Sequence, residues 1–157
     1  MDRQLIEHYA AGAEAPVSAI CGLTAADLDA TPVAGTWSIR QIVVHLLDSD
    51  LVGSERMKRV IAMDGPVLLG YDETLFASRL HYQTADVEQV CALFRLNRLL
   101  TADLLRRLPE AAFRRTGNHS ERGLLTLADL VLDEVEHPEH HLKYIRQKRA
   151  LLGKPLD

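Results

Sequence analysis

The stretch "TWSIRQIVVHLLDSD", residues 36–50, contains a complete helix start and indicates the class of fold. Ser38 can accept a hydrogen bond from the backbone of Gln41, while the Gln41 side chain can reach back to the backbone of Ser38, an arrangement known as a capping box. Apolar residues from Ile42 onward then follow at helical spacing. The sequence therefore predicts a helix from Ser38 to about Met63.

Proline and glycine divide the rest of the chain into further helical segments. Long helices are predicted over residues 3–22, 38–63, 85–108 and from 126 onward, with a shorter helix over residues 74–82. We expect the first to bend or break at Pro16, because a proline cannot donate a backbone hydrogen bond within a helix. Thr126 and Asp129 repeat the capping arrangement at the start of the last helix.

These segments predict an all-α protein, an antiparallel four-helix bundle with one long crossover connection between the second and third helices. The short helix lies within that connection, and no segment alternates long enough between apolar and polar residues to indicate a strand. No interior linker is evident, so residues 1–157 are expected to form a single domain. A chain of this length can bury a core without a disulfide or a metal, so that a bound metal would serve function.

Composition narrows the class of protein. Apolar residues make up 47% and charged residues 25% of the chain, and the formal net charge is −4, which gives no basic field for nucleic acid. No run approaches the length of a membrane span, and the first residues carry too many charges for a signal peptide. We expect a cytoplasmic protein with neither nucleic-acid nor membrane partners, in which Cys21 and Cys91 remain buried, reduced thiols.

Three of the seven histidines indicate a metal site. His137 and His141 lie one turn apart on the apolar face of the last helix, and His45 lies on the apolar stripe of the second. Inward side chains of facing helices build metal sites in bundles, and three histidines leave the open fourth position of a catalytic zinc-type site. The competing interpretation is that one histidine is a hydrogen-bonded core residue and the others are solvated.

The neighbours of these histidines leave several roles open. Glu134 is interpreted as an orienting acceptor, an outer ligand or, with most weight, a helix-surface charge. His140 is rotated about 100° from His141, so we expect it in solvent or behind the ligands. Pro138 predicts either a kink or a boundary between two helices.

Other polar positions are expected to be solvated. Asn97 and Thr101 on the third helix, like Ser49 on the second, have two interpretations, the lining of a polar pocket and a place at a helix edge in water, of which the second is preferred. The scattered residues His8, His81 and His119 are interpreted as surface positions.

The chain resembles the DinB-like (YfiT-like) family. The resemblance runs through "TWSIRQIVVHLLDSD", "GYDETLFASRLHY", the segment from "VEQVCALFRLN" to "GLLTLADLV" and the terminal "HPEHH" element. It implies an up-down-down-up four-helix bundle, often dimeric, with a divalent ion held by the residues that correspond to His45, His137 and His141. Asp50 stands where the family usually has glutamate, and Pro138 enters the final motif.

The resemblance also suggests an activity. Some relatives are thiol-dependent transferases or isomerases, so we expect a metal-dependent S-transferase that joins a low-molecular-weight thiol to an electrophilic small molecule. The metal would be Zn, Ni or a similar divalent ion, and the protein a homodimer. The alternatives are a metal-dependent hydrolase and a non-catalytic metal-binding bundle in the stress response; the sequence assigns no catalytic residue and does not exclude a bundle without metal.

Overall fold

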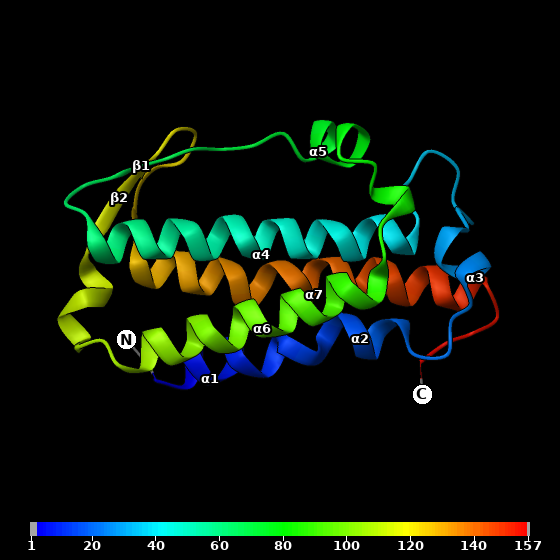
Figure 1. Cartoon of the computed structure of the whole chain (residues 1–157), viewed down its shortest axis with the longest axis horizontal. Coiled ribbons are helices and arrows are strands. Elements are labelled where there is room, and N and C mark those ends of the chain that lie inside the picture. The colour runs from blue at the N-terminus through cyan, green and yellow to red at the C-terminus, as the bar shows by residue number, and fades with distance from the viewer. Residues whose placement is uncertain (1–2, 157) are drawn as a thin grey trace.

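The computed structural model describes residues 3–156, which fold into four long helical segments packed lengthwise (Figure 1). In chain order the elements are α1 (Arg3–Ala11), the 3₁₀ helix η1 (Gly12–Glu14), α2 (Ala15–Ile20), α3 (Ala25–Asp29), α4 (Ile39–Ala62), β1 (Val67–Leu68), α5 (Glu73–Arg79), the 3₁₀ helix η2 (Tyr82–Thr84), α6 (Val87–Arg106), the 3₁₀ helix η3 (Glu110–Arg114), β2 (Thr116–His119), β3 (Gly123–Thr126) and α7 (Leu127–Leu151).

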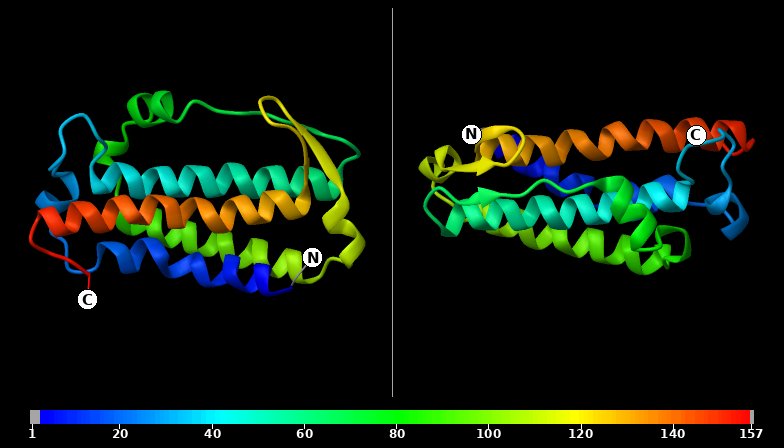
Figure 2. Two further views of the ribbon diagram at one scale, coloured as in Figure 1. Left: turned by 180° about the vertical axis from the view of Figure 1, so that it is seen from behind. Right: turned by 90° about the horizontal axis from the view of Figure 1, so that it is seen from above.

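The direction of the helices confirms the expected topology. α1 and α2 together form the first bundle helix and run the same way as α7, whereas α4 and α6 both run the opposite way (Figure 1). Since α4 and α6 are parallel, the chain between them has to return along the bundle, and this crossover lies along the outer side of α4 (Figure 2). The fold is therefore an up-down-down-up four-helix bundle with the predicted crossover.

The predicted helix starts are confirmed by their hydrogen bonds. The backbone N–H of Ser38 donates to Oε1 of Gln41 over 2.9 Å, and the backbone N–H of Gln41 donates to Oγ of Ser38 over 3.2 Å. Thr126 and Asp129 form the same capping box at α7. The first bundle helix breaks as expected, because η1 interrupts it just before Pro16 in the first turn of α2.

A small three-stranded sheet is the feature that the helical pattern does not predict. β1, in the crossover, pairs in parallel with β2, and β2 pairs with β3 in an antiparallel hairpin. The expectation of no strands is corrected here, because strands of two to four residues are too short to show alternation in the sequence. The sheet ties the crossover to the segment that leads into α7.

A polar layer divides the apolar core of the bundle. One buried cluster surrounds the N-terminal halves of α4 and α6, and a second surrounds their C-terminal halves. Between them lie buried polar residues that include His45, Asp50, Arg98 and Glu134. Within residues 3–156, no helix has both the length and the apolar character needed to cross a membrane.

Candidate metal centre

The three predicted histidines converge at the middle of the bundle. Nε2 of His45 in α4 lies 3.2 Å from Nε2 of His137 and 3.2 Å from Nε2 of His141, both in α7. One ring nitrogen of each lies within 4.8 Å of the other two. His45 is 1% exposed, and the other two are half-buried. The structure thus brings together the residues that the sequence singled out.

The arrangement fits a tetrahedral metal ion. Nitrogen ligands about 2.0–2.1 Å from zinc at tetrahedral angles lie about 3.3 Å apart, close to the spacing of these Nε2 atoms. A neutral imidazole has one N–H donor, so three ring nitrogens that face one another cannot all be satisfied by mutual hydrogen bonds. A cation at their centre would serve all three lone pairs.

The protonation state is also suitable for metal binding. Burial, reinforced by the neighbouring imidazoles, lowers the pKa of His45 to about 3 and the pKa values of His137 and His141 to about 4. The rings are therefore neutral near pH 7, the form in which histidine binds a metal. Nδ1 of His45 and Nδ1 of His137 are buried without a hydrogen-bond partner in the described structure, so no contact described there fixes which ring nitrogen carries the proton.

Glu73 adds a carboxylate to the open side of the cluster. Its Oε2 lies 3.5 Å from Nε2 of His45, and its side chain is 57% exposed. Asp72 accepts a hydrogen bond from the backbone of Leu75 and so caps α5, which makes Glu73 the first residue of that helix. The sequence does not predict the role of Glu73, because its carboxylate meets the histidines only once the crossover has folded back onto α4. The helix cap in "YDETL" is the one local signal that places Glu73 at the start of a helix.

Two cavities flank the histidines. A cavity of about 970 Å³ is lined by His141, Trp37 and Glu73, and a smaller one of about 240 Å³ by His137, Glu134 and Glu73. The smaller cavity also contains Ser49 and Tyr71, whose hydroxyl groups are hydrogen-bonded to each other. Ser49 is buried rather than solvated, so its expected place at a helix edge in water is wrong. The centre is thus open to space on both sides.

α7 carries two of the histidines and continues through Pro138 without a break. The proline leaves the carbonyl of Glu134 without its helical partner, and Nη2 of Arg98 in α6 donates to that carbonyl instead. The predicted boundary between two helices is therefore wrong. A buried guanidinium supplies the hydrogen bond that the proline removes, next to His137.

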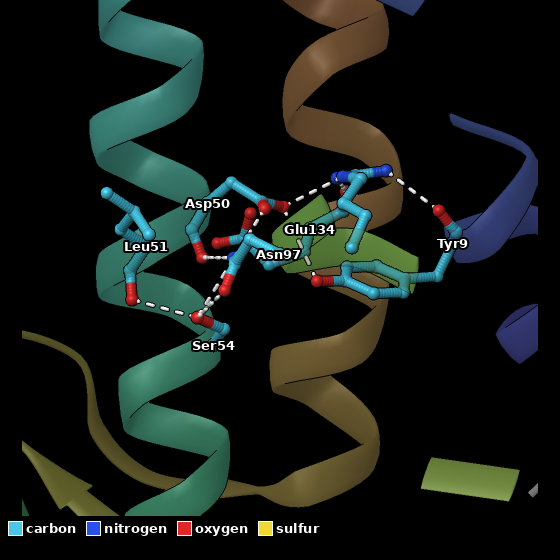
Figure 3. A network of polar contacts seen from close by, with 7 residues as sticks. Tyr9, Asp50, Leu51, Ser54, Asn97 and Glu134 are labelled. Atoms are coloured by element: carbon cyan, nitrogen blue, oxygen red, sulfur yellow. Dashed lines mark hydrogen bonds and ion pairs between the residues drawn. The ribbon is translucent and has the colours of Figure 1, made fainter. Parts of the chain in front are cut away.

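Arg98 contacts Tyr9 of α1, Asp50 of α4 and Glu134 of α7, and so belongs to a buried network that joins four elements (Figure 3). Its Nε lies 2.8 Å from Oδ1 of Asp50, its Nη1 donates to the carbonyl of Tyr9 over 3.0 Å, and its guanidinium carbon lies 4.4 Å from the Tyr9 ring centroid. Asn97 donates to Oδ2 of Asp50 over 2.7 Å, and Thr101 is 1% exposed. The expectation that Thr101 is solvated is therefore wrong, because other helices cover that side of α6, whereas Asn97 is half-buried with its amide hydrogen-bonded inside the network.

Glu134 is buried at the same level, so its interpretation as a surface charge is wrong. Burial raises the pKa of its carboxyl to about 8, and Oε2 has no hydrogen-bond partner among the described residues. Its side chain packs against Gly53 of α4, where a Cβ atom would lie 2.1 Å from Oε1 of Glu134. Only a residue without a side chain fits this contact between α4 and α7.

The remaining histidines and the cysteines divide between surface and core. His140 is exposed as predicted, as are His8 and His81. His119 is 5% exposed, so its placement at the surface is wrong: β2 turns its ring inward, where Nδ1 accepts a hydrogen bond from the backbone of Glu121. Both cysteines are free, but Cys21 is exposed and only Cys91 is buried, which corrects half of the expectation.

Known proteins resemble the chain over most of its length. YfiT of Bacillus subtilis, named "putative metal-dependent hydrolase", is 31% identical over 133 residues, which are 83% of this chain and 74% of YfiT. A Bacillus licheniformis protein of the same designation is 30% identical over 137 residues, which are 87% of this chain and 78% of that protein. The solved structure of YfiT, described as an unusual four-helix bundle, matches with a TM-score of 0.82 and 28% identity over 96% of this chain and 85% of YfiT.

A family model also matches the chain, over most of the bundle. The model described as the DinB superfamily matches residues 11–145, a range that includes His45, His137 and His141. The match extends from the end of α1 to near the end of α7 and so spans the crossover and the histidine cluster. The chain belongs to the DinB superfamily.

Proposed function

We propose that the protein is a metal-dependent hydrolase whose divalent ion is held by His45, His137 and His141. The observation that carries the proposal is the convergence of three Nε2 atoms, in which that of His45 lies 3.2 Å from each of the other two, beside the exposed carboxylate of Glu73. The names of the relatives support the same reaction class. Three imidazoles suit zinc or nickel better than magnesium or calcium, which prefer oxygen ligands.

The proposed chemistry assigns a role to each group. His45, His137 and His141 would hold a divalent ion, which would supply a water-derived nucleophile near neutral pH. The Glu73 carboxylate is placed to accept the proton, because it lies 3.5 Å from Nε2 of His45 on the open side. The hydroxyl groups of Ser49 and Tyr71 line the adjoining cavity and can donate hydrogen bonds to a polar substrate atom.

Transfer of a thiol to an electrophile is the second candidate. The observation in its favour is the size of the cavity beside His141, about 970 Å³, which can hold a thiol and a second small molecule together. A thiol that entered the open position on the metal ion would be ionised there, as a water molecule would be. A purely structural ion is disfavoured, because structural zinc sites have four protein ligands and no adjoining cavity of this size.

The ligand set is tested by metal analysis of protein purified without a histidine tag. About one equivalent of zinc or another divalent ion is expected in the wild type and in His140→Gln, an exposed neighbour that serves as the control. His45→Gln and His141→Gln are expected to lose the ion while circular dichroism shows retained helix. Equal metal content in all four proteins, or none in reconstituted wild type, would contradict the proposal.

The reaction class is tested with Glu73→Gln in metal-loaded protein. We expect the wild type to hydrolyse p-nitrophenyl esters and the variant to lose about 10²- to 10⁴-fold in kcat at unchanged metal content, as when a general base is removed. Addition of cysteine to chlorodinitrobenzene is measured in parallel. Thiol addition without ester hydrolysis would reject the hydrolase in favour of the second candidate.

A further inference from the structure

The cavity beside His141 has apolar walls that are left open to solvent. Trp37 and Ile42 form its inner side, while Val33, Tyr144 and Leu151 line it with exposed fractions of 45%, 43% and 62%. Large apolar side chains gathered around one concave site usually contact an apolar ligand. The walls therefore suit a molecule with an extended hydrocarbon or aromatic body.

Lys148 brings a buried positive charge to the same cavity. The residue is 4% exposed, and its Nζ lies 2.6 Å from Oγ1 of Thr36, which also lines the cavity. An ammonium group has three N–H donors, so two remain for another acceptor. Within residues 3–156, no carboxylate lies within ion-pair distance of Lys148, and burial lowers the pKa of its ammonium group.

The other two buried cations of the described chain each have more hydrogen-bond acceptors than Lys148, although only Arg98 is paired with a carboxylate. Arg98 is paired with Asp50, and Arg149 donates to the carbonyls of Ala19 and Cys21. Among the described residues, the one hydrogen-bond partner of Lys148 is the neutral hydroxyl of Thr36. A buried charge is costly unless it is paired, so the missing partner of Lys148 is most simply an anion that enters the cavity.

The distance to the histidines sets the size of that ligand. Lys148 follows His141 by seven residues in α7, so both project from nearly the same face, about 10 Å apart along the helix axis. Glu73 lies at the histidine end, where a negative charge disfavours a second anion. A ligand would thus place its anionic group at Lys148 and its uncharged end at the histidines.

We propose that this cavity is the binding site for an amphipathic carboxylate about 10 Å long, whose carboxylate pairs with Nζ of Lys148 and whose apolar body lies against Trp37. The identification of the histidine end as the reacting end rests on the proposed function, whereas the binding of the anion does not. The substrate class is then an apolar molecule with a carboxylate at one end and the susceptible bond near the other.

Trp37 makes the proposal directly measurable, because it is the one tryptophan of the chain and it lines the cavity. Its fluorescence is followed while hexanoate, octanoate, decanoate and the neutral analogue octanamide are titrated into zinc-loaded protein. Lys148→Met removes the charge at similar length, Lys143→Met removes an exposed charge of the same helix as the matched control, and Lys148→Arg restores a cation. Thermal unfolding checks that each variant is folded.

We expect the wild type and Lys143→Met to bind octanoate more tightly than octanamide, with Lys148→Met weakening octanoate about tenfold or more and leaving octanamide unchanged. Lys148→Arg should recover part of the preference. Equal affinities for the two ligands in the wild type, equal octanoate affinities in both methionine variants, or no fluorescence change at millimolar ligand would each overturn the proposal.

A carboxylate that bound the metal ion instead would give a different pattern. Its affinity would be insensitive to Lys148→Met and lost in His141→Gln, which also rejects the proposal. Failure of the proposed function is distinguishable, since protein that holds no metal should still prefer octanoate through Lys148.

Discussion

The three histidines, together with Glu134, show how burial determines the charge of single residues at this centre. Imidazoles held 3.2 Å apart in a largely desolvated layer are neutral, because a proton on one ring would be both poorly solvated and repelled by its neighbours. The buried carboxyl of Glu134 is protonated more readily than usual for the same reason. The two kinds of group therefore make stability depend on pH with opposite signs.

The histidines predict that the metal-free protein loses stability in mild acid. Their pKa values lie at about 3 to 4 in the folded chain and near 6.5 when unfolded, so between these values the unfolded state binds protons that the folded state does not. The contribution of the neutral histidines to the stability of the fold is complete above a pH of about 6.5 and is lost as the pH falls towards 4. Urea midpoints of chelator-treated protein at pH 7 and pH 5 should show this loss, and His141→Gln should reduce it. An unchanged difference in His141→Gln would contradict the prediction.

Glu134 predicts the reverse dependence at higher pH. Its pKa of about 8 exceeds the ordinary value of 4.5, so between these values the folded state holds a proton that the unfolded state lacks. The contribution of Glu134 to the stability of the fold is complete below a pH of about 4.5 and is lost as the pH rises through 8. Glu134→Gln, which keeps the shape and removes the titration, should be less destabilised than the wild type between pH 6 and pH 9. Parallel pH profiles of the two proteins would show that Glu134 is not protonated in the fold.

At the scale of the element, α7 shows how a helix tolerates an internal proline. Pro138 leaves the carbonyl of Glu134 without a helical hydrogen bond, and Arg98 of α6 provides one. The helix is therefore continuous, which excludes the boundary between two helices, one of the two alternatives that the sequence left open. The proline can stay beside His137 because a second helix compensates for it.

This compensation predicts an energetic coupling between Pro138 and Arg98. Pro138→Ala restores the helical N–H, so Arg98→Met should cost about 1–2 kcal/mol less in the Pro138→Ala background than in the wild type. Asp50→Asn is the matched control, because it disturbs the same guanidinium without touching the carbonyl of Glu134, and its cost should be equal in both backgrounds. The comparison uses free energies of unfolding in urea. Additive effects of Arg98→Met and Pro138→Ala would show that the contact contributes nothing.

How far the sequence predicts such elements depends on whether the information is local. The caps at Ser38 and Thr126 involve residues three apart, and the spacing of His137 and His141 follows from one helix, so both were predicted correctly. Thr101 and Glu134 were placed in water, because burial on those faces depends on which helices pack against them. The strands were missed since two to four residues cannot establish a period, and Glu73 was missed since the crossover places it.

At the scale of the whole molecule, the candidate centre depends on how closely α4 and α7 approach. His45 comes from one helix and its two partners from the other, so the Nε2 distances are set by the packing of the bundle. Gly53 of α4 lies so close to the side chain of Glu134 in α7 that an added Cβ would lie 2.1 Å from Oε1. The homodimer that the family resemblance implies would add a further level of packing and stays a prediction.

The effect of Gly53→Ala on the free energy of unfolding should therefore have opposite signs in the presence and in the absence of the Glu134 side chain. In the wild type the new Cβ would lie 2.4 Å from Cδ and 2.8 Å from Cγ of Glu134, so that Cγ as well as the carboxylate of this buried side chain would have to shift, and a loss of about 1–3 kcal/mol is expected. In the Glu134→Ala background the clash is absent, and replacing a helical glycine by alanine should stabilise by about 0.5–1 kcal/mol. Zinc affinity should follow the same pattern, weaker in Gly53→Ala alone and restored in the double variant, because the clash moves the helices that carry the histidines. Loss of stability without loss of zinc affinity would instead mean that the centre adjusts independently of the packing between α4 and α7.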